Sequence, residues 1–535
     1  MPAIQSQLDP ASESFQGNRT RMLELIARVR SLEQRTRDKS GGAKPLFDRR
    51  GQLLPRERVA RLLDPGAPWL ELCSLAGYCL DDPDPDKSIP GGGMIAGIGY
   101  VSGARAVVVA SDSGIDAGAI QHMGREKLLR AQHLALENRL PFVHLVESAG
   151  ANLLKYRVEG FIHGGGIFYN LARLSAAGCP VITVVHGSST AGGAYMPGLS
   201  DYVIMVRGRA KAFLAGPPLL KAATGEIATD EELGGAVMHT HVSGLGEYLA
   251  EDDSDGVRLA REVLGRLNFA SRPKPADARP PRYPAEELLG VMPADTRKPV
   301  DMREAIARFA DDSDWLDFKP DYGAATVCGH AAIQGQRVGI VTNNGPLDPA
   351  GATKATHFIQ ACCQAGLPLL YLQNTTGYIV GKASEEAGMI KHGSKMIQAV
   401  SNATVPQITL MCGASFGAGN YGMCGRAYNP SFLFSWPNAQ TAVMGAEQAA
   451  LTMAIVMEGG MKRKGLKVDR SEIDSMKEKI IQNFEKQQSA FVTSAHLLDD
   501  GVIDPRDTRN VLGFVLSICS ERGTLNPIQF GVARP

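Results

Sequence analysis

Two segments of this chain align with each other without a gap. "PVITVVHGSSTAGGAY" at 180–195 and "PQITLMCGASFGAGNY" at 406–421 share seven of sixteen positions. Upstream, "LPFVHLVESAG" at 140–150 pairs with "LPLLYLQNTTG" at 367–377, and "SGARAVVVASD" at 102–112 pairs with "QGQRVGIVTNN" at 334–344. Similarity that keeps its order over such a length indicates an internal duplication. We therefore predict two copies of one domain.

Each copy alternates short apolar runs with longer helical patterns. In the first copy the apolar runs are "RAVVVAS", "PFVHLVE" and "PVITVVH", and the helical patterns are "KLLRAQHLALENRL" and "GIFYNLARLSAAG". Apolar strands separated by helices predict a parallel sheet with crossover helices, which is an α/β fold. A separate helix is predicted around residues 22–32, ended by "DKSGGAKP".

A proline-rich stretch separates the two copies. "SRPKPADARPPRYP" at 271–284 holds five prolines and is typical of a stiff, exposed linker. The length of 535 residues also exceeds what one hydrophobic core usually supports. We predict an N-terminal domain over 1–280 and a C-terminal domain over 285–535.

Composition excludes several classes of partner. The 56 Lys and Arg residues balance 56 Asp and Glu residues, so there is no basic excess for nucleic acid or an anionic membrane. With no run of eighteen apolar residues and no signal-peptide pattern at the N-terminus, we expect a cytoplasmic protein. The nine cysteines form no Cys-x-x-Cys pair and the histidines have no metal-binding spacing, so we expect no protein-bound metal.

Each copy leaves its aligned strand through a turn of small residues. These include Gly192 and Gly193 in the first copy, and Ala418 and Gly419 after Gly417 in the second. The glycines could serve only a tight turn, but a missing Cβ also lets another molecule reach the backbone N–H groups. Two such groups at a helix start would stabilise a developing oxyanion. Two pockets suit carboxyl transfer from biotin to an acyl thioester, because both partners develop charge on a carbonyl oxygen.

Further motifs extend over most of the chain. The first half contains "GGGMIAGIGYVSGA", "GSSTAGGAYMPGLSD", "FLAGPPLLKAATGE", and "LGGAVMHTHVSG" followed by "AEDD". The second half contains "GYIVG", "SFGAGNYGMCGRAYNPSFLFSWPNA", "VMGAEQAA" and "DDGVIDPRDTR". With these motifs the chain resembles the carboxyltransferase β subunits of biotin-dependent acyl-CoA carboxylases, in particular the methylcrotonoyl-CoA and geranoyl-CoA branch.

The resemblance implies two tandem crotonase-like (ClpP/crotonase) domains, with acyl-CoA on the N-terminal domain and biotin on the C-terminal domain of another copy. Gly192 and Gly193 would hold the thioester oxygen, and Ala418 and Gly419 the biotin carbonyl. Further residues are expected to line the two sites: Gly164, Gly165, Ala191, Tyr195 and Lys221 for acyl-CoA, and Phe416, Gly417 and Tyr421 for biotin. Lys221 could contact a CoA phosphate or be an ordinary surface lysine.

The chain lacks two parts of a complete carboxylase. "GYIVGKA" does not have the spacing of a phosphate-binding loop, and "GGMKRKG" shares only Met-Lys with the biotin acceptor sequence. We therefore expect biotin and the ATP chemistry on a partner, the biotin carboxylase and biotin carboxyl carrier α subunit. CoA would enter as part of the substrate. The family resemblance implies a hexameric homo-oligomer with active sites between chains.

One segment bears on the acyl group. In "FIHGGGIFYN" at 161–170, the residue after the histidine is Gly164, where relatives acting on methylcrotonoyl-CoA carry a bulky aromatic. A missing ring leaves space for a longer tail. We expect carboxylation of the γ carbon of geranoyl-CoA, a step of acyclic terpene degradation, with 3-methylcrotonoyl-CoA of leucine degradation as the alternative. Gly164 could instead only permit a turn.

Two rival functions remain open from the sequence. "GASFG" at 413–417 matches the nucleophile elbow of α/β-hydrolases, with Ser415 followed by Asp469 or Asp474 and then His496. Against this, the aligned copy reads "GSSTA" and lacks the final glycine. The other rival is a noncatalytic scaffold for the biotin-carrying partner.

Overall fold

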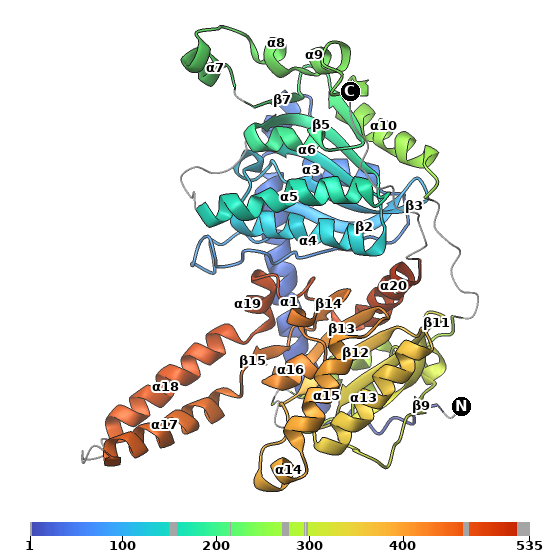
Figure 1. Ribbon diagram of the computed structural model, residues 1–535, viewed down its shortest axis with the longest axis vertical. Helices are drawn as coiled ribbons and strands as arrows, with labels where there is room; N and C mark the ends of the chain where they lie inside the picture. Colours follow the sequence, from blue (N-terminus) through green and yellow to red (C-terminus); the bar gives the residue numbers. More distant parts are fainter. Residues whose placement is uncertain are drawn as a thin grey trace. The chain divides into compact units, whose positions relative to one another are not determined.

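The computed structural model describes residues 3–148, 158–214, 216–269, 278–293, 295, 298–463 and 470–521 (Figure 1). Contacts divide the chain into two units. The N unit comprises Arg30–Pro273, Ala495–Leu497 and Ser520–Pro535; the C unit comprises Met1–Val29, Lys274–Ser494 and Leu498–Cys519. The binding roles predicted for 1–280 and 285–535 stay predictions.

The N unit is built on a sheet of order β1-β2-β3-β4-β5-β6-β8, with β7 pairing β5. Its strands are β1 (Leu70–Glu71), β2 (Met94–Val101), β3 (Ala104–Ser111), β4 (Phe142–Ser148), β5 (Val181–Thr190), β6 (Tyr202–Val206), β7 (Lys211–Phe213) and β8 (Tyr248–Ala250). From β3 onward the pairings are parallel, as the alternating apolar runs predicted.

Besides α1 (Glu13–Gly41), the helices of the N unit are α2 (Lys44–Arg49), α3 (Pro55–Leu62), α4 (His122–Asn138), α5 (Val158–Ala176), α6 (Tyr195–Gly198), α7 (Pro217–Thr224), α8 (Asp230–Gly234), α9 (Ala236–His241) and α10 (Asp253–Arg266). Helices α3 and α10 pack on the face that carries Val143 and Ile182. Helices α4 and α5 lie side by side on the other face (Figure 1).

The C unit has a sheet of order β14-β13-β12-β11-β10-β9, with β15 pairing β13. Its strands are β9 (Leu316–Asp317), β10 (Thr326–Ile333), β11 (Gln336–Asn343), β12 (Leu369–Thr375), β13 (Gln407–Phe416), β14 (Phe432–Ser435) and β15 (Gln440–Ala442). Its helices include α11 (Leu288–Val291), α12 (Arg303–Ile306), α13 (Pro349–Gln364), α14 (Lys382–Glu386), α15 (Met389–Ser401), α16 (Ala418–Gly422), α17 (Ala446–Arg463) and α18 (Arg470–Gln487). The short α19 (Ala490–Ala495) and the longer α20 (Thr508–Ser520) follow.

Strand register confirms the predicted duplication. In the N unit, the β4–β5 pairing shifts between Val146 and Ser148, so that Ser148 lies opposite Ser189. In the C unit, the β12–β13 pairing shifts at the same place and sets Thr375 opposite Ser415. The sheet of each unit contains an antiparallel hairpin before its parallel strands, β2–β3 or β10–β11. The two tandem α/β domains expected from the sequence are therefore present.

The duplication extends to a charged clamp that the sequence analysis missed. In each unit an aspartate accepts both N–H groups of the hairpin turn, at 102–103 or at 334–335. The same aspartate pairs with an arginine of a later helix: Asp64 with Arg261 at 2.8 Å, and Asp311 with Arg509 at 2.6 Å. The hairpin of each sheet is thus attached to a distant helix.

The predicted N-terminal helix is confirmed and is longer than its apolar pattern. Helix α1 runs over Glu13–Gly41 and so ends within the predicted stop "DKSGGAKP", and α2 begins at Lys44 inside the same stretch. Within the C unit, Met22 and Ile26 of α1 are buried against Leu289. None of the helices in the described ranges is long and apolar enough to span a bilayer.

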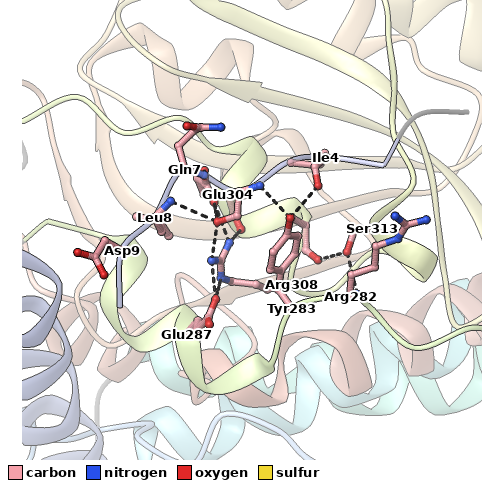
Figure 2. Close-up of polar contacts among 12 residues, drawn as sticks. Ile4, Gln7, Leu8, Asp9, Arg282, Tyr283, Glu287, Glu304, Arg308 and Ser313 are labelled. Atoms are coloured by element: carbon pink, nitrogen blue, oxygen red, sulfur yellow. Dashed lines mark hydrogen bonds and ion pairs between the residues drawn. The ribbon is translucent and has the colours of Figure 1, made fainter. Parts of the chain in front are cut away.

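The segment before α1 lies along the C unit and is held by a buried arginine (Figure 2). The Ser6 hydroxyl and the Gln7 N–H donate to the two carboxylate oxygens of Glu304, at 2.6 and 2.7 Å. Arg308, 1% exposed, pairs with Glu304 at 2.9 Å and with Glu287 at 2.6 Å. One guanidinium therefore neutralises two carboxylates and holds the N-terminal segment.

Replacing Arg308 by Met should destabilise the C unit, because two carboxylates of low exposure lose their cation. We expect the free energy of unfolding to fall by about 2 to 4 kcal/mol, measured from the urea midpoint and slope. Arg282→Met is the control: Arg282 is exposed and lies 4.0 Å from Asp312, so the expected loss is below about 1 kcal/mol. Equal losses in the two variants would contradict this account.

Candidate functional site

In the N unit, β5 passes directly into a short helix at the predicted turn. After Thr190 the chain forms a 3₁₀ helix, η3 (Ala191–Ala194), and continues into α6. The first N–H groups of a helix have no acceptor within it. Gly192 is exposed and Gly193 is buried, and neither has a positive φ. The backbone angles therefore do not require glycine here.

A buried serine of β5 holds this turn by a hydrogen bond to its backbone. Ser189, at the register shift of β5, is fully buried, and its hydroxyl donates to the carbonyl oxygen of Gly193 at 2.8 Å. A Cβ added at Gly193 would lie 3.5 Å from that hydroxyl oxygen, which is an ordinary contact. Packing therefore does not demand glycine at 193.

An aromatic pair flanks the turn. A Cβ at Gly192 would lie 3.7 Å from the Cζ of Phe168 on α5, and the rings of Phe168 and Tyr195 lie 5.8 Å apart. Tyr195 is about half exposed, as a wall residue would be. Phe168 was not predicted. Only its place four residues after Gly164, on the same face of a helix, could have indicated it.

Gly164 and Gly165 lie inside α5, which begins at Val158, and not in a turn. The alternative that Gly164 only permits a turn is wrong, because neither residue has a positive φ. A Cβ at Gly164 would meet Arg125 Cδ at 3.7 Å, and one at Gly165 would meet nothing within 4 Å. Glycine weakens a helix relative to alanine. Neither backbone angle nor packing accounts for these two glycines.

The remaining predicted residues of the N unit are placed less specifically. Ala191 begins η3, directly before the two glycines. Lys221 lies exposed on α7, and within the described ranges no hydrogen bond or ion pair links its side chain to the turn. Its contact with a CoA phosphate therefore stays a prediction.

The turn of the C unit has the same place but different geometry. Strand β13 ends at the buried Phe416, and Gly417 has φ +55° and ψ −148°, a conformation that favours glycine. Helix α16 then begins at Ala418, which is exposed. A Cβ at Gly419 would lie 2.9 Å from Thr375 Cγ2. In contrast to Gly193, Gly419 is therefore required by packing.

The aromatic residue Tyr421 of α16 is about half exposed, and its ring lies 5.9 Å from that of Tyr428. The predicted residues Phe416, Gly417, Ala418, Gly419 and Tyr421 therefore lie together at one strand-to-helix junction.

Ser415 is enclosed in the sheet and cannot act as a nucleophile. It is fully buried; its hydroxyl donates to Gln373 Oε1 and accepts from Asn420 Nδ2 at 2.7 Å. A nucleophilic serine needs a general base and an open path to the substrate. Asp469 lies outside the described residues. The hydrolase hypothesis is therefore contradicted by the burial and partners of Ser415.

Four ionisable side chains of the N unit lie together around His186 of β5. His186 of β5 and Asp253 of α10 are 2.8 Å apart, from Nδ1 to Oδ1. Arg58 of α3 lies 2.9 Å from Asp253 and 2.6 Å from Glu147 of β4. Arg58, Asp253 and His186 are 1%, 2% and 0% exposed. We call these four residues the N-unit network.

Burial and the guanidinium act on the pKa values of this network. Burial and the nearby Arg58 hold the pKa of His186 below its ordinary value, although Asp253 opposes the shift. Burial acts to raise the pKa of Glu147, but Arg58 and hydrogen bonds together hold it below its ordinary value. The network therefore consists of one cation, two carboxylates and a neutral imidazole near neutral pH.

Comparison with known proteins defines the class. The family model of the carboxyl transferase domain matches residues 48–526, and the chain belongs to this family. It is 46% identical, over 99% of its length and 100% of the relative's, to a probable biotin-dependent acyl-coenzyme A carboxylase beta2 subunit of Mycobacterium tuberculosis. It is 42% identical, over 99% and 91%, to the mitochondrial methylcrotonoyl-CoA carboxylase beta chain of Dictyostelium discoideum.

A solved structure gives the more particular likeness. The crystal structure of the beta subunit of Pseudomonas aeruginosa geranyl-CoA carboxylase is 55% identical, matches both chains over 100% of their length, and has a TM-score of 0.93. The expected resemblance is confirmed: the chain is a carboxyltransferase β subunit of the biotin-dependent acyl-CoA carboxylases. Since this is a family of enzymes, the scaffold hypothesis has no support.

Proposed function

We propose that this chain transfers a carboxyl group, brought by biotin on a partner subunit, to the γ carbon of geranoyl-CoA. The observation that carries the proposal is the glycine-bearing face of α5, which adjoins the N-unit turn through Phe168. The N unit would bind the acyl-CoA, and the C unit of another copy would bind the biotin.

The N-unit turn suits the thioester oxygen. When the γ carbon of an enoyl-CoA loses a proton, conjugation moves the negative charge to the thioester oxygen. In our proposal the N–H groups of Gly192 and Gly193 donate to that oxygen. Ser189 holds the turn in place through the Gly193 carbonyl. Fixed backbone donors need no rearrangement as the charge develops.

The C-unit turn fits the second ligand. Biotin supplies the carboxyl group and a ureido carbonyl that takes up charge. The N–H groups of Ala418 and Gly419, at the start of α16, would donate to this carbonyl, because the first N–H groups of a helix lack acceptors within it. Phe416, Gly417 and Tyr421 would line the same pocket.

The acyl tail would run along α5. Phe168 lies beside Gly192, and Gly164 lies one helical turn before Phe168 on the same helix face. At 164–165 this helix carries no side chain, so an isoprenoid tail could pass the ring and lie over bare backbone. The 55% identical structure is that of a geranyl-CoA carboxylase β subunit. The methylcrotonoyl-CoA carboxylase relatives support 3-methylcrotonoyl-CoA as the second candidate.

Exposed apolar side chains support a homo-oligomer. Helices α17 and α18 lie side by side and extend away from the sheet of the C unit (Figure 1). On α17, Leu451, Ile455 and Val456 are each more than half exposed. Contiguous apolar surface of this kind marks interaction sites. We infer that copies of this chain associate; a hexameric core remains the expectation from the family.

Activity should depend on the partner. The chain alone should carboxylate no acyl-CoA with ATP and bicarbonate, because it has neither a phosphate-binding loop nor a biotin acceptor sequence. Combined with the biotin-carrying subunit, it should carboxylate geranoyl-CoA with a higher kcat/KM than methylcrotonoyl-CoA, measured by fixation of labelled bicarbonate. ATP-dependent product formation by the chain alone would contradict the proposal.

Removing one backbone N–H group should distinguish stabilisation of an oxyanion by the turn from catalysis by Ser415. Ala418→Pro deletes one donor, and proline is tolerated at the first position of a helix. We expect turnover by the assembled enzyme to fall about 100- to 1,000-fold. Ser415→Ala, which removes only a buried hydroxyl, should keep most of the turnover. Loss of turnover in Ser415→Ala, with Ala418→Pro still fully active, would contradict the assigned role of the Ala418 N–H group.

Filling the bare face of α5 should change substrate choice. Gly164→Phe should lower kcat/KM for geranoyl-CoA by about two orders of magnitude and spare methylcrotonoyl-CoA, because the ring would occupy the space of the tail. Gly164→Ala is the matched control: its Cβ fits, so both substrates should be retained. Equal losses on both substrates in a folded Gly164→Phe enzyme would overturn the tail assignment.

A further inference from the structure

The N-unit network fixes one residue of β5 at two points. The imidazole of His186 is held by Asp253, as described above. Its carbonyl oxygen accepts from Gln52 Nε2 at 3.2 Å, and the same amide group donates to Glu147 at 3.1 Å. The side chain of His186 is therefore held by Asp253 and its main chain by Gln52, which also binds Glu147 of the network. His186 lies six residues before Gly192.

The C unit provides an internal control for this network. In the aligned segments, Cys412 stands where the N unit has His186, and Asn374 stands where it has Glu147. The carbonyl oxygen of Cys412 accepts from the neutral amide of Asn438 at 3.0 Å. The C unit thus forms the same strand, register shift and following turn without an ionic network at these positions.

This difference between the two units distinguishes charges that the shared fold requires from charges that only the N unit requires. Buried ion pairs often contribute little to stability, because removing charges from water offsets their attraction. If the fold alone demanded the N-unit network, the C unit would need an equivalent. The charges of the N unit therefore relate to what this unit holds, which in our proposal is the acyl-CoA.

The second nitrogen of His186 is left without a partner. Within the part of the chain that the structure describes, its Nε2 is buried and makes no hydrogen bond. Since Nδ1 faces the carboxylate of Asp253, Nδ1 carries the proton and Nε2 is a bare acceptor. A second proton on Nε2 would place a donor where there is no acceptor.

We propose that His186 is a positioning residue for carboxyl transfer: the neutral imidazole, bound to Asp253, fixes the end of β5 so that the N–H groups of Gly192 and Gly193 face the thioester oxygen. This inference rests on the proposed function, because that function supplies the ligand of the turn. His186 acts through the strand and not by contact with the substrate.

The direction of the pH effect follows from the surroundings of His186. Arg58 disfavours the imidazolium, whereas Asp253 and Glu147 favour it, and burial decides for the neutral ring. A group whose pKa is lowered in the folded protein stabilises the fold above its ordinary pKa. That contribution is lost as the pH falls through the lowered value. Because protonation of His186 would disturb the strand end that it holds, we expect the rate of carboxyl transfer to fall at acid pH as His186 becomes charged. We call this fall the acid limb of the pH profile.

The first test uses the enzyme assembled with its biotin-carrying subunit. In His186→Ala, we expect kcat to fall about 10- to 100-fold at pH 8 with little change in KM, because the turn is displaced while acyl-CoA binding elsewhere remains. His186→Asn keeps an N–H donor toward Asp253 and should restore most of kcat, but without the acid limb. Unchanged kcat and an unchanged pH profile in His186→Ala would overturn the proposal.

A matched control separates positioning from loss of a buried ring. His144 of β4 is also a buried imidazole, and burial lowers its pKa to about 4, but it lies outside the network. His144→Ala should cost stability and leave kcat and its pH profile as in the wild type. If His144→Ala lowers kcat as much as His186→Ala, the effect is merely structural and the proposal fails.

The second test needs no substrate. Hydrogen exchange of the free chain, followed in peptides that cover 187–195, should be faster in His186→Ala than in the wild type, His186→Asn or His144→Ala. An assembled wild-type enzyme that carboxylates no enoyl-CoA would overturn the proposed function, while exchange still decides the positioning. Equal exchange in all four proteins would overturn the role of His186.

Discussion

The N-unit turn depends on a buried serine at a slipped pair of parallel strands. In both units the register shifts just before the functional turn, and a serine of the central strand lies at the shift. Ser189 binds the carbonyl oxygen of Gly193, and Ser415 binds the side chain of Asn420 in the turn that follows it. Backbone N–H groups cannot be aimed by their own side chains. They are aimed by whatever holds the neighbouring backbone. In the N unit the Ser189 hydroxyl does this through the Gly193 carbonyl, whereas in the C unit Ser415 contacts only a side chain of the turn.

The two copies have kept this arrangement and changed what surrounds it. The N unit enters its turn with no positive φ at Gly192 or Gly193 and places charged side chains beneath the strand. The C unit enters through a left-handed Gly417 and uses neutral partners. The same strand-to-helix turn is therefore formed in two different surroundings. This is consistent with two ligands that each develop charge on a carbonyl oxygen but differ in the rest of their structure.

Patterns along the chain were enough to predict the duplication, the parallel strands and the first helix, because strand and helix periods are local properties. Contacts between distant residues were not accessible: Arg58 and Asp253 lie 195 positions apart, and neither belongs to a motif that predicts a pair. Local patterns also misled. The Gly-x-Ser-x-Gly match at Ser415 carries no information on burial. The glycine pattern at 164–165 also left open the alternative that Gly164 only permits a turn, whereas Gly164 lies within α5, which packs against α4.

The ring of Phe168 lies between the proposed oxyanion site and the proposed path of the acyl tail. Phe168 lies against Gly192, whose N–H group we assign to the thioester oxygen, and it follows Gly164 by one helical turn. A tail leaving the thioester must pass this ring before it reaches the bare face of α5. The thioester end is thus held by backbone N–H groups whose contacts do not depend on the length of the acyl chain. The enzyme distinguishes acyl chains of different length only beyond Phe168, where residues 164–165 of α5 carry no side chain. Because the two tasks fall on different residues, the space for the tail could be enlarged without disturbing the oxyanion site.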